Sequence, residues 1–344
     1  MNIYGLLRLV GKNRIPGFVK LLGLWGMHVT GRRSIGIFLD PVLACNLRCR
    51  MCLFSSESHR TEMKGMLNER QLDWIDRGLF RHALKLQIGC GAEPTLYPSL
   101  EGIVERGKRA GIPYISLITN GQLIGKGKVS LERLVNAGLS EITISMHGTR
   151  KETYEYLMPG SDFSLLLELL KEIGRTKEKF PQFKARVNFT VNSMNVVDLE
   201  KDRFWKIWPE GVRPDIVQLR PVQNLGDSTW TDFDLTPLKE RYDSTIGAIA
   251  EECRRQNIMC IVPDKEQLDE VATSQKGVEA IIEDYSYCYV SPKGAYKPDY
   301  DWNKDTFESY HRRHHTGRRL LRSVFSHSAG RDKKTTKKLN YTVK

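Results

Sequence analysis

Short apolar runs alternate along the chain with longer segments in which apolar residues recur every three or four positions. Six runs have the length and the β-branched content of buried strands: 34–40, 84–89, 114–119, 141–146, 185–191 and 215–220. The segments between them show helical periodicity, as at Leu72, Ile75 and Leu79 after an Asn68 cap, and again over 166–173. This alternation predicts parallel βα units, in an open doubly wound sheet or in a whole or partial barrel.

The two ends of the chain follow different patterns. Residues 234–258 predict a helix leading into a short strand at 259–262, and 287–302 predict a hairpin around a Ser-Pro-Lys-Gly turn. Near the start, Phe18, Leu21, Leu22 and Trp25 form one apolar helical stripe. We expect this stripe to pack on the body of the protein, with a membrane interface as the alternative because its polar side is basic. No apolar run is long enough for a spanning helix or resembles a signal peptide.

Charge and cysteine content narrow the possible functions. The net charge is +12, but residues 1–310 carry 42 basic and 40 acidic groups, so the excess belongs to the end of the chain. From about Ser326 we expect a basic, disordered tail, with contact to anionic lipid or RNA as the alternative. Seven unevenly spread cysteines do not suit a disulfide framework. They indicate a reducing compartment, so we expect a cytoplasmic protein, with membrane association as the alternative.

Polar motifs follow each of the first four predicted strands. They are CNLRCRMC (45–52), GCGAEP (89–94), TNG (119–121) and SMHG (145–148). The carboxyl ends of parallel strands meet at one edge, where the connecting loops converge on a single mouth. We therefore expect the four motifs to form one site.

The first motif places Cys45, Cys49 and Cys52 in a single loop. Three thiolates can hold three irons of a [4Fe-4S] cluster and leave the fourth iron open to another ligand. A zinc site completed by Cys90 or a histidine is the competing interpretation, because catalytic zinc also keeps an open position. A structural zinc knuckle usually has two close pairs of ligands, and no second pair follows here.

The sequence resembles the radical S-adenosylmethionine (SAM) enzymes in the order of four motifs: the Cys-x3-Cys-x2-Cys loop, the GAEP segment, the TNG segment and the serine of the fourth strand. The resemblance spans roughly Ile35 to Pro221. It implies a partial (βα)6 TIM-type barrel with a small C-terminal extension. It also implies one [4Fe-4S] cluster held by the three cysteines and a SAM molecule bound to its open iron. The expected activity is reductive cleavage of SAM to a 5'-deoxyadenosyl radical that abstracts hydrogen from a substrate.

The same resemblance assigns the SAM contacts. Gly91, Ala92 and Glu93 correspond to the segment that receives the SAM amino group, where small residues allow close approach. The contacts to methionine and ribose fall on Asn120, Ser145 and Asn188, and Arg220 would bind the SAM carboxylate or a substrate anion. Met51 stands where the family usually has an aromatic residue beside the adenine; its polarisable side chain can cover a ring face. Local turn or strand-end roles, or a structural salt bridge at Arg220, are the alternatives. No catalytic residue beyond the cluster ligands is identified, and Cys90 is expected to be a packed free thiol.

The predicted hairpin is similar to the SPASM or twitch extension, which holds an auxiliary cluster in many relatives. Cys288 fits its first cysteine, but Pro298 stands about where the second would be. We therefore expect one cluster and a hairpin without metal, and we expect Cys253 and Cys260 to pack in the interior. The resulting division is an amphipathic helical segment (1–33), the core barrel (34–235), the extension (236–325) and the basic tail (326–344).

The sequence leaves the substrate open. A peptide or protein side chain is the first interpretation because SPASM-like extensions often accompany peptide modification; cofactor, lipid or sugar chemistry and methyl transfer are alternatives. The electron donor would be a low-potential protein such as flavodoxin or ferredoxin. The alternative outside the enzymes is a non-catalytic zinc-bearing module that binds RNA or a membrane. Such a module would have no use for the segment at 91–94.

Overall fold

The structure is a computed structural model that describes residues 15–224, 226–269, 277–328 and 342–343. Its described strands form one sheet in the order β10-β7-β6-β5-β4-β3-β2-β1-β8-β9. They are β1 (Ile35–Leu39), β2 (Ala83–Ile88), β3 (Ile115–Thr119), β4 (Glu141–Ser145), β5 (Lys184–Val191), β6 (Ile216–Pro221), β7 (Met259–Val262), β8 (Tyr287–Ser291), β9 (Gly294–Tyr296) and β10 (Thr342–Val343). All neighbours from β7 to β8 pair in parallel, and only the edge strands β9 and β10 pair antiparallel.

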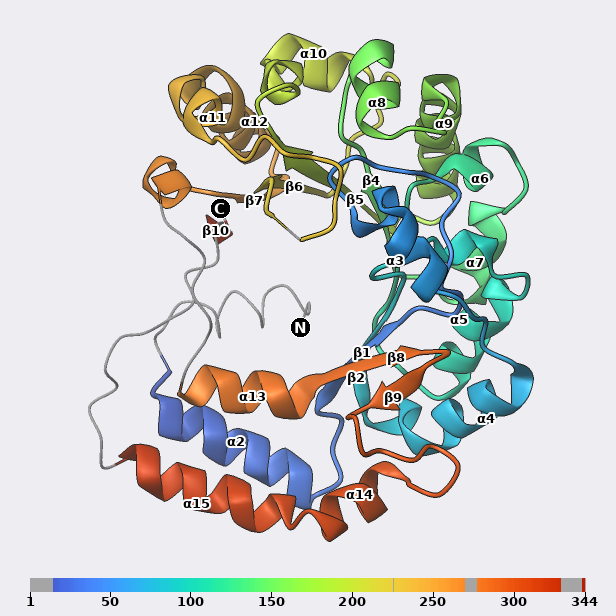
Figure 1. The fold of residues 1–344 in the computed structure, drawn as a ribbon, viewed down its shortest axis with the longest axis vertical. Helices are drawn as coiled ribbons and strands as arrows, with labels where there is room; N and C mark the ends of the chain where they lie inside the picture. Colours follow the sequence, from blue (N-terminus) through green and yellow to red (C-terminus); the bar gives the residue numbers. More distant parts are fainter. Residues whose placement is uncertain (1–14, 225, 270–276, 329–341, 344) are drawn as a thin grey trace.

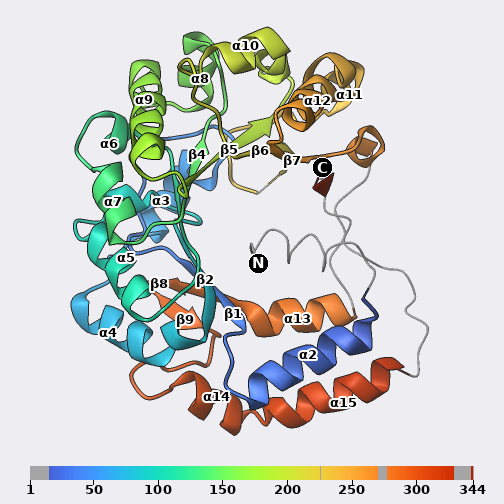
Figure 2. The same cartoon turned by 180° about the vertical axis from the view of Figure 1, so that it is seen from behind.

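The sheet curves into an incomplete barrel with its helices along the convex side (Figure 1), and the view from behind shows the same crescent (Figure 2). The helices of the barrel are α3 (Glu57–Glu62), α4 (Glu69–Gly78), α5 (Leu100–Arg109), α6 (Gln122–Gly125), α7 (Leu131–Ala137), α8 (Lys151–Leu157), α9 (Phe163–Lys179), α10 (Lys201–Lys206), α11 (Thr236–Glu240) and α12 (Ala248–Arg255). A separate helical layer beside β1, β8 and β9 contains α2 (Gly17–Val29), α13 (Val278–Ser286), α14 (Phe307–Arg313) and α15 (Thr316–Ser328).

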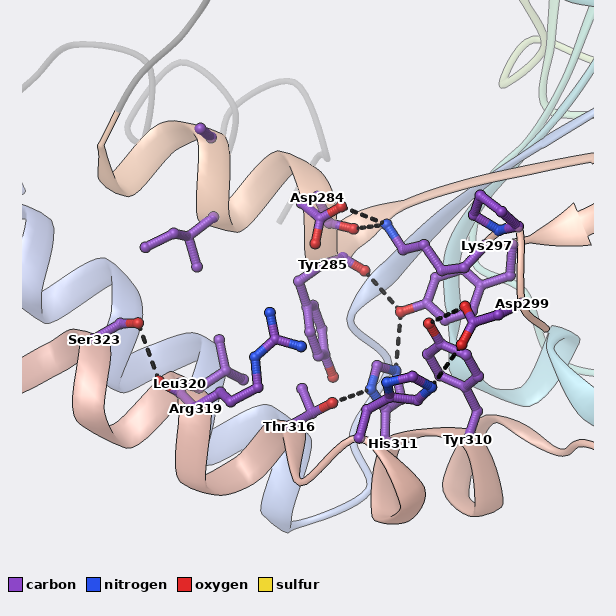
Figure 3. A pocket seen from close by; sticks show the side chains of 15 residues that line it. Asp284, Tyr285, Lys297, Asp299, Tyr310, His311, Thr316, Arg319, Leu320 and Ser323 are labelled. Carbon is purple, nitrogen blue, oxygen red and sulfur yellow. Dashed lines mark hydrogen bonds and ion pairs between the residues drawn. The ribbon is translucent and has the colours of Figure 1, made fainter.

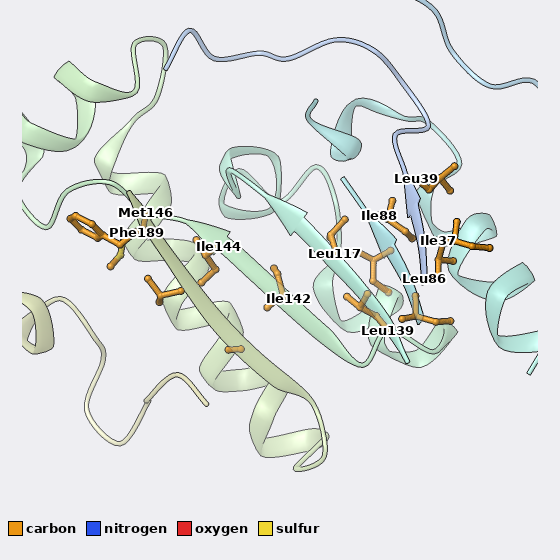
Figure 4. Packing of buried hydrophobic residues seen from close by; sticks show 14 of the residues in the cluster. Ile37, Leu39, Leu86, Ile88, Leu117, Leu139, Ile142, Ile144, Met146 and Phe189 are labelled. Atoms are coloured by element: carbon orange, nitrogen blue, oxygen red, sulfur yellow. The ribbon is translucent and has the colours of Figure 1, made fainter. Parts of the chain in front are cut away.

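Buried and partly exposed residues alternate along the strands, and the buried residues form the face of the sheet that contacts the helices. In β5 every second residue from Ala185 to Val191 is buried, while the residues between them are partly exposed. Equivalent buried residues of β1 to β5 pack in one layer beneath the helices, including Ile37, Leu86, Ile144 and Phe189 (Figure 4). The inner face therefore carries mostly polar side chains, with Phe38 and Ile118 among the exceptions, as expected for a barrel whose lumen is accessible.

The six strands predicted from the sequence are confirmed, as are the strand at 259–262 and the partial-barrel fold. The Asn68 cap is also confirmed, because its side chain and that of Gln71 form a capping box at the start of α4. Two predictions were wrong in extent. The single helix expected over 234–258 is divided into α11, a π-helical turn η5 (Asp243–Gly247) and α12. The hairpin strands end at Tyr296, and residues 297–302 form turns instead.

The C-terminal elements extend the barrel sheet at both edges. β7 pairs with β6, and β8 pairs with β1, so one sheet crosses the boundary predicted near residue 235. The helix α15 continues to Ser328, and Thr342–Val343 pair with β7, so these parts of the predicted tail have regular structure. The remainder of the predicted tail, and residues 1–14 of the predicted N-terminal segment, lie outside the described residues.

The orientation of α2 differs from the prediction. Leu21 and Leu24 are buried, whereas Phe18 and Leu22 of the expected stripe are exposed. The reason is that α2 packs between α13 and α15, so its buried side is set by two neighbours. Within the described ranges, no helix combines the length and hydrophobicity needed to cross a membrane.

Candidate functional site

Hydrogen bonds bring the motif loops together at the carboxyl ends of the strands. The backbone N–H of Glu93 donates to the carbonyl of Ala44 at 2.9 Å, next to the first cysteine. The side-chain amide of Asn120 donates to Asn46 Oδ1 at 2.9 Å, and the backbone N–H of Asn120 donates to Glu93 Oε2 at 2.8 Å. The first three motifs therefore form one connected unit, as the parallel sheet predicted.

The cysteine loop is anchored on the opposite side by the chain that leads into α9. Backbone N–H groups of Arg48 and Arg50 donate to the carbonyls of Pro159 and Leu157, each at 2.9 Å. Within the loop, the N–H of Leu47 points to Cys45 Sγ at 3.4 Å. Such an N–H to sulfur contact stabilises negative charge on the sulfur. The loop is thus held from both sides, and all three of its cysteines remain partly exposed.

The three thiols influence one another. Burial, followed by the neighbouring thiols of Cys52 and Cys45, raises the pKa of Cys49 well above its usual value. Burial also raises the pKa of Cys45 to about 12 and raises the pKa of Cys52. No three His, Cys, Asp or Glu side chains of the described residues are arranged to hold a single metal ion. In an iron–sulfur cluster each thiolate binds a different iron.

The buried carboxylate of Glu93 accepts hydrogen bonds from two of the motif loops. Glu93 is 2% exposed, and its Oε1 accepts from Thr95 N at 3.1 Å, Thr95 Oγ1 at 2.5 Å and Thr119 Oγ1 at 2.6 Å. Burial raises the pKa of this carboxyl, and the hydrogen bonds oppose the shift. The side chain is directed into the protein, so its carboxylate connects the second motif to the third.

Asp40, which the sequence reasoning missed, fixes the other end of the same loop. It follows β1, is completely buried, and accepts from Cys90 N at 2.7 Å and Gly91 N at 3.0 Å. The hydroxyl of Tyr289 on β8 donates to the same carboxylate at 2.8 Å. A contact across 249 positions thus ties the C-terminal hairpin to the loop at 89–94.

The glycine that the fold requires in this loop is Gly89. It has a φ of +87°, and a Cβ there would lie 2.4 Å from the carbonyl oxygen of Ile118. Gly91 has no such φ, and a Cβ there would make an ordinary contact at 3.5 Å with Asp40. Gly89 therefore has a structural reason to be glycine, whereas at Gly91 the backbone alone supplies none.

Ser145 and Asn188 differ from Asn120 in how their polar groups are satisfied. Asn120 is 6% exposed, and its side chain both donates to Asn46 and accepts from Gln122 N. Ser145 and Asn188 are register partners on β4 and β5, and both are partly exposed on the inner face. Asn188 Oδ1 is buried and has no hydrogen-bond partner among the described residues. A buried acceptor of this kind calls for a donor from elsewhere.

Met51 lies at the side of the site. It is 7% exposed and packs with Leu157 and Val222, with Trp230 and Phe233 at the edge of this small cluster. Its neighbour in the chain, Cys52, is partly exposed. The predicted adenine-covering residue is therefore held in an apolar patch next to the cysteine loop.

Charged groups line the inner face below the motif loops. Arg186 Nε lies 3.0 Å from Glu141 Oε1, and Lys85 Nζ donates to Gln87 at 2.9 Å. Burial and the nearby Arg186 lower the pKa of Lys85 to about 8. Arg220 is exposed near the end of β6. When the side-chain amide of Gln218 is oriented with its oxygen toward Arg220, this oxygen accepts from Arg220 Nη2 at 2.6 Å. The lumen therefore offers several cationic groups.

The remaining cysteines divide into two kinds. Cys253, Cys260 and Cys288 are buried, as expected for packing residues. The prediction that Cys90 is packed was wrong: it is exposed, with Gln87 Nε2 at 3.7 Å from its sulfur. The reason is that the turn at 89–91 directs its backbone N–H, rather than its side chain, toward buried Asp40.

A cavity of about 410 Å³ lies in the separate helical layer, outside the motif loops. Its walls come from α13, the end of β9, α14 and α15 (Figure 3). Most of its polar groups bind one another: Tyr296 with His311 at 2.9 Å, His311 with Thr316 at 2.9 Å, and Lys297 with Asp284 at 2.9 Å. None of the residues that line it belongs to the four motifs.

Comparison with known protein families gives one match, in which residues 40–179 correspond to the radical SAM superfamily. The chain is similar to a GTP 3',8-cyclase of Aquifex aeolicus, with 31% identity over 56% of this chain and 57% of that protein. It is also similar to a probable GTP 3',8-cyclase of Sulfolobus acidocaldarius, with 22% identity over 67% of this chain and 72% of that protein. The chain thus spans little more than half the length of the Aquifex protein.

The fold is similar to that of Streptococcus suis SuiB bound to S-adenosylmethionine, with a TM-score of 0.56 and 13% identity. The match covers 83% of this chain and 68% of SuiB. A structure of SuiB bound to the precursor peptide SuiA gives a TM-score of 0.54. At this identity the likeness concerns the fold alone.

Proposed function

We propose that this chain, whose residues 40–179 match the radical SAM superfamily, is a radical SAM enzyme that uses a [4Fe-4S] cluster and SAM and generates a 5'-deoxyadenosyl radical at the motif end of its barrel. In this proposal Cys45, Cys49 and Cys52 hold one cluster. When bound, the cluster supplies the electron that cleaves SAM to methionine and the radical, which then abstracts hydrogen from the substrate.

Support for the proposal comes from three partly exposed thiols in one loop at the carboxyl end of β1 and from an unsatisfied acceptor on the inner face of the same sheet. The thiols share one loop, held from two sides. On β5, four strands along the sheet from β1, Asn188 Oδ1 is a buried acceptor without a partner among the described residues, and Ser145 of β4 lies next to it in register. A ribose offers hydroxyl donors to such an acceptor. The residues present therefore fit a cluster together with a nucleoside-bearing ligand.

The other residues of the site position these groups. Asp40 and Glu93 hold the two ends of the segment at 89–94, and we propose that the backbone of Gly91 and Ala92 between them receives the SAM amino group. Met51 would offer its apolar surface to the adenine. The thiols lose their protons when they bind metal, so the raised pKa of Cys49 makes cluster assembly favourable at alkaline pH.

Cluster assembly can be tested without any substrate. After anaerobic reconstitution with iron and sulfide, we expect four irons per chain and a brown chromophore, and we expect Cys45→Ala, Cys49→Ala and Cys52→Ala each to lose both. Cys90→Ala is the matched control, because this exposed thiol lies beside the site and should not be a ligand. Zinc in place of iron in the wild-type protein would contradict the proposal and favour the zinc-bearing binding module.

The SAM contacts call for a separate readout. The electron paramagnetic resonance spectrum of the reduced cluster should change on addition of SAM. Asn188→Ala and Ser145→Ala should each need about tenfold more SAM for the same change, the loss of one or two hydrogen bonds. Thr143→Ala, on the same face of β4 one pleat below Ser145, is the control. Equal titration curves for all four proteins would remove these two residues from the proposed site.

For the substrate, two candidates are proposed. A peptide or protein side chain stays the first, supported by the likeness of the C-terminal hairpin to extensions that accompany peptide modification. GTP is the second, supported by the names of the two similar cyclases and by Lys85, Arg186 and Arg220 on the inner face, which suit a polyphosphate. SAM-dependent consumption of GTP by the reconstituted enzyme would select the second, and its absence would favour the first.

Partners and location complete the proposal. Radical SAM enzymes need a reductant, and we propose flavodoxin or ferredoxin as the donor in a cytoplasmic setting. Product analysis separates radical initiation from methyl transfer, because the former yields 5'-deoxyadenosine with methionine and the latter yields S-adenosylhomocysteine.

A further inference from the structure

Exposed hydrophobic side chains gather on two helices far from the motif loops. Ten large hydrophobic side chains are exposed among the described residues, and five of them belong to α2 and α15: Phe18, Val19, Leu22, Val29 and Phe325. Phe325 is 67% exposed, the highest value of the ten. Single exposed hydrophobic residues are ordinary, but a concentration of this kind marks an interaction surface.

The two helices lie side by side and run in opposite directions. Leu21 of α2 and Val324 of α15 share one small hydrophobic cluster, and a Cβ at Gly317 would come within 4.0 Å of Val29. The end of α15 therefore lies near the start of α2, and α2 lies between α13 and α15 (Figures 1 and 2). This arrangement places Phe325 at the level of Phe18 and Leu22.

The outward face of α2 is entirely apolar. Phe18, Leu22 and Val29 are spaced so that they fall on one line of the helix, with Gly23 and Gly26 beside them, while Leu21 and Leu24 are buried on the other side. The only charged residue of this helix, Lys20, is directed away to Glu279 of α13, at 3.4 Å. Apolar residues thus face solvent where a globular surface normally carries charge.

Positive charge borders this apolar face. Arg318 and Arg322 are exposed on the same side of α15 as Phe325, whereas Arg319 lines the cavity between α13 and α15, and neither helix contains an acidic residue. The neighbouring helix α13 carries three acids: Glu279, which pairs with Lys20, Asp284, which pairs with Lys297, and the exposed Glu283. In sequence, the adjoining residues 1–14 and 329–344 add nine basic residues and one acidic residue.

We propose that α2 and α15 form a docking surface for an anionic lipid bilayer. The apolar face of α2, together with Phe325, enters the boundary between headgroups and acyl chains, and the arginines of α15 contact anionic headgroups. A nucleic acid would use the arginines but leave the aliphatic residues in water. A second copy of this chain, paired by two-fold symmetry, would bring the arginines of both copies together. The inference is independent of the proposed radical chemistry.

The test uses the full chain and vesicles of phosphatidylcholine, with or without phosphatidylglycerol. We expect co-sedimentation with the anionic vesicles, at least about tenfold weaker binding to phosphatidylcholine alone, and weakening by salt. Leu22→Ser and Phe325→Ser should each reduce partitioning about tenfold. Arg318→Gln and Arg322→Gln should each reduce it about fivefold, and on anionic vesicles only.

Leu84→Ser is the matched control, because Leu84 is an exposed leucine on β2, outside both helices, and its replacement should leave partitioning unchanged. Circular dichroism of each variant verifies that the fold is retained. The proposal is overturned if the wild-type chain does not sediment with anionic vesicles, or if Leu22→Ser and Leu84→Ser bind equally well. It is also overturned if Leu22→Ser converts a dimer into a monomer in sedimentation equilibrium without changing vesicle binding.

Discussion

Removing the buried carboxylate of Asp40 should destabilise the protein strongly, because three donors converge on it. Its oxygens accept from two backbone N–H groups at 2.7 and 3.0 Å and from the Tyr289 hydroxyl at 2.8 Å. A hydrogen bond to a charged acceptor contributes about 1.5–3 kcal/mol, and a buried donor left unpaired costs about 1–3 kcal/mol. Allowing for relaxation and for the lost burial penalty of the charge, we expect Asp40→Ala to cost about 3–5 kcal/mol.

The Tyr289 hydroxyl makes only one of these contacts, so Tyr289→Phe should cost about 1.5–2 kcal/mol in the wild-type background. In the Asp40→Ala background the hydroxyl has lost its acceptor, and the same change should cost less than about 0.5 kcal/mol. The expected coupling free energy is therefore about 1.5 kcal/mol. A coupling of this size would mean that the C-terminal hairpin stabilises the loop at 89–94 directly.

The assay is urea unfolding of the metal-free, reduced protein, followed by tryptophan fluorescence, for the wild type, both single variants and the double variant. Tyr287→Phe is the matched control. Tyr287 lies two residues away on β8, is 43% exposed and stacks on Phe38, and its loss of a hydroxyl should change stability by less than about 0.5 kcal/mol. A coupling within about 0.5 kcal/mol of zero would refute the linkage between hairpin and loop.

Two further predictions concern stability. Gly89→Ala should lower the free energy of unfolding by more than about 3 kcal/mol, because the φ of Gly89 is +87° and the new Cβ would clash with the Ile118 carbonyl. Gly91→Ala should lower it by less than about 1 kcal/mol. Equal urea midpoints for the two variants would contradict this difference. Burial lowers the pKa of His147 to about 4 from a usual 6.5, so the neutral form stabilises the fold above pH 6.5 and this contribution is lost as the pH falls toward 4. Between pH 7 and pH 5 the free energy of unfolding of the wild type should fall by about 2 kcal/mol more than that of His147→Gln. If the urea midpoints of the two proteins change equally between these pH values, His147 does not titrate in this way.

The positions of the strands and the convergence of the motifs were predictable from local patterns, whereas the strand order of a partial barrel was expected only from the family resemblance. Alternating apolar residues define the strands, and parallel strands bring their carboxyl ends to one edge. Asp40 could not be found in this way. Its partner Tyr289 is 249 positions distant, and an aspartate after a strand is common in any turn. The sequence shows the loop that needs support, but only the fold shows which residue supplies it.

Side-chain direction is the second kind of information that the sequence did not contain. A helix with an apolar stripe from Phe18 to Trp25 was predicted, but the buried side of α2 depends on α13 and α15, which are distant in sequence. The segment at 91–94 was found as well, yet Glu93 turns its carboxylate inward and Cys90 remains exposed. Motif spacing selects the backbone segment, whereas packing decides where each side chain points.

The formation of 5'-deoxyadenosine would show whether this chain generates the proposed radical. The reconstituted protein is incubated anaerobically with dithionite and SAM, and Cys49→Ala is treated in the same way. We expect 5'-deoxyadenosine and methionine from the wild type and neither product from the variant. A wild-type protein that carries zinc, shows no iron–sulfur absorption and forms no 5'-deoxyadenosine would contradict it.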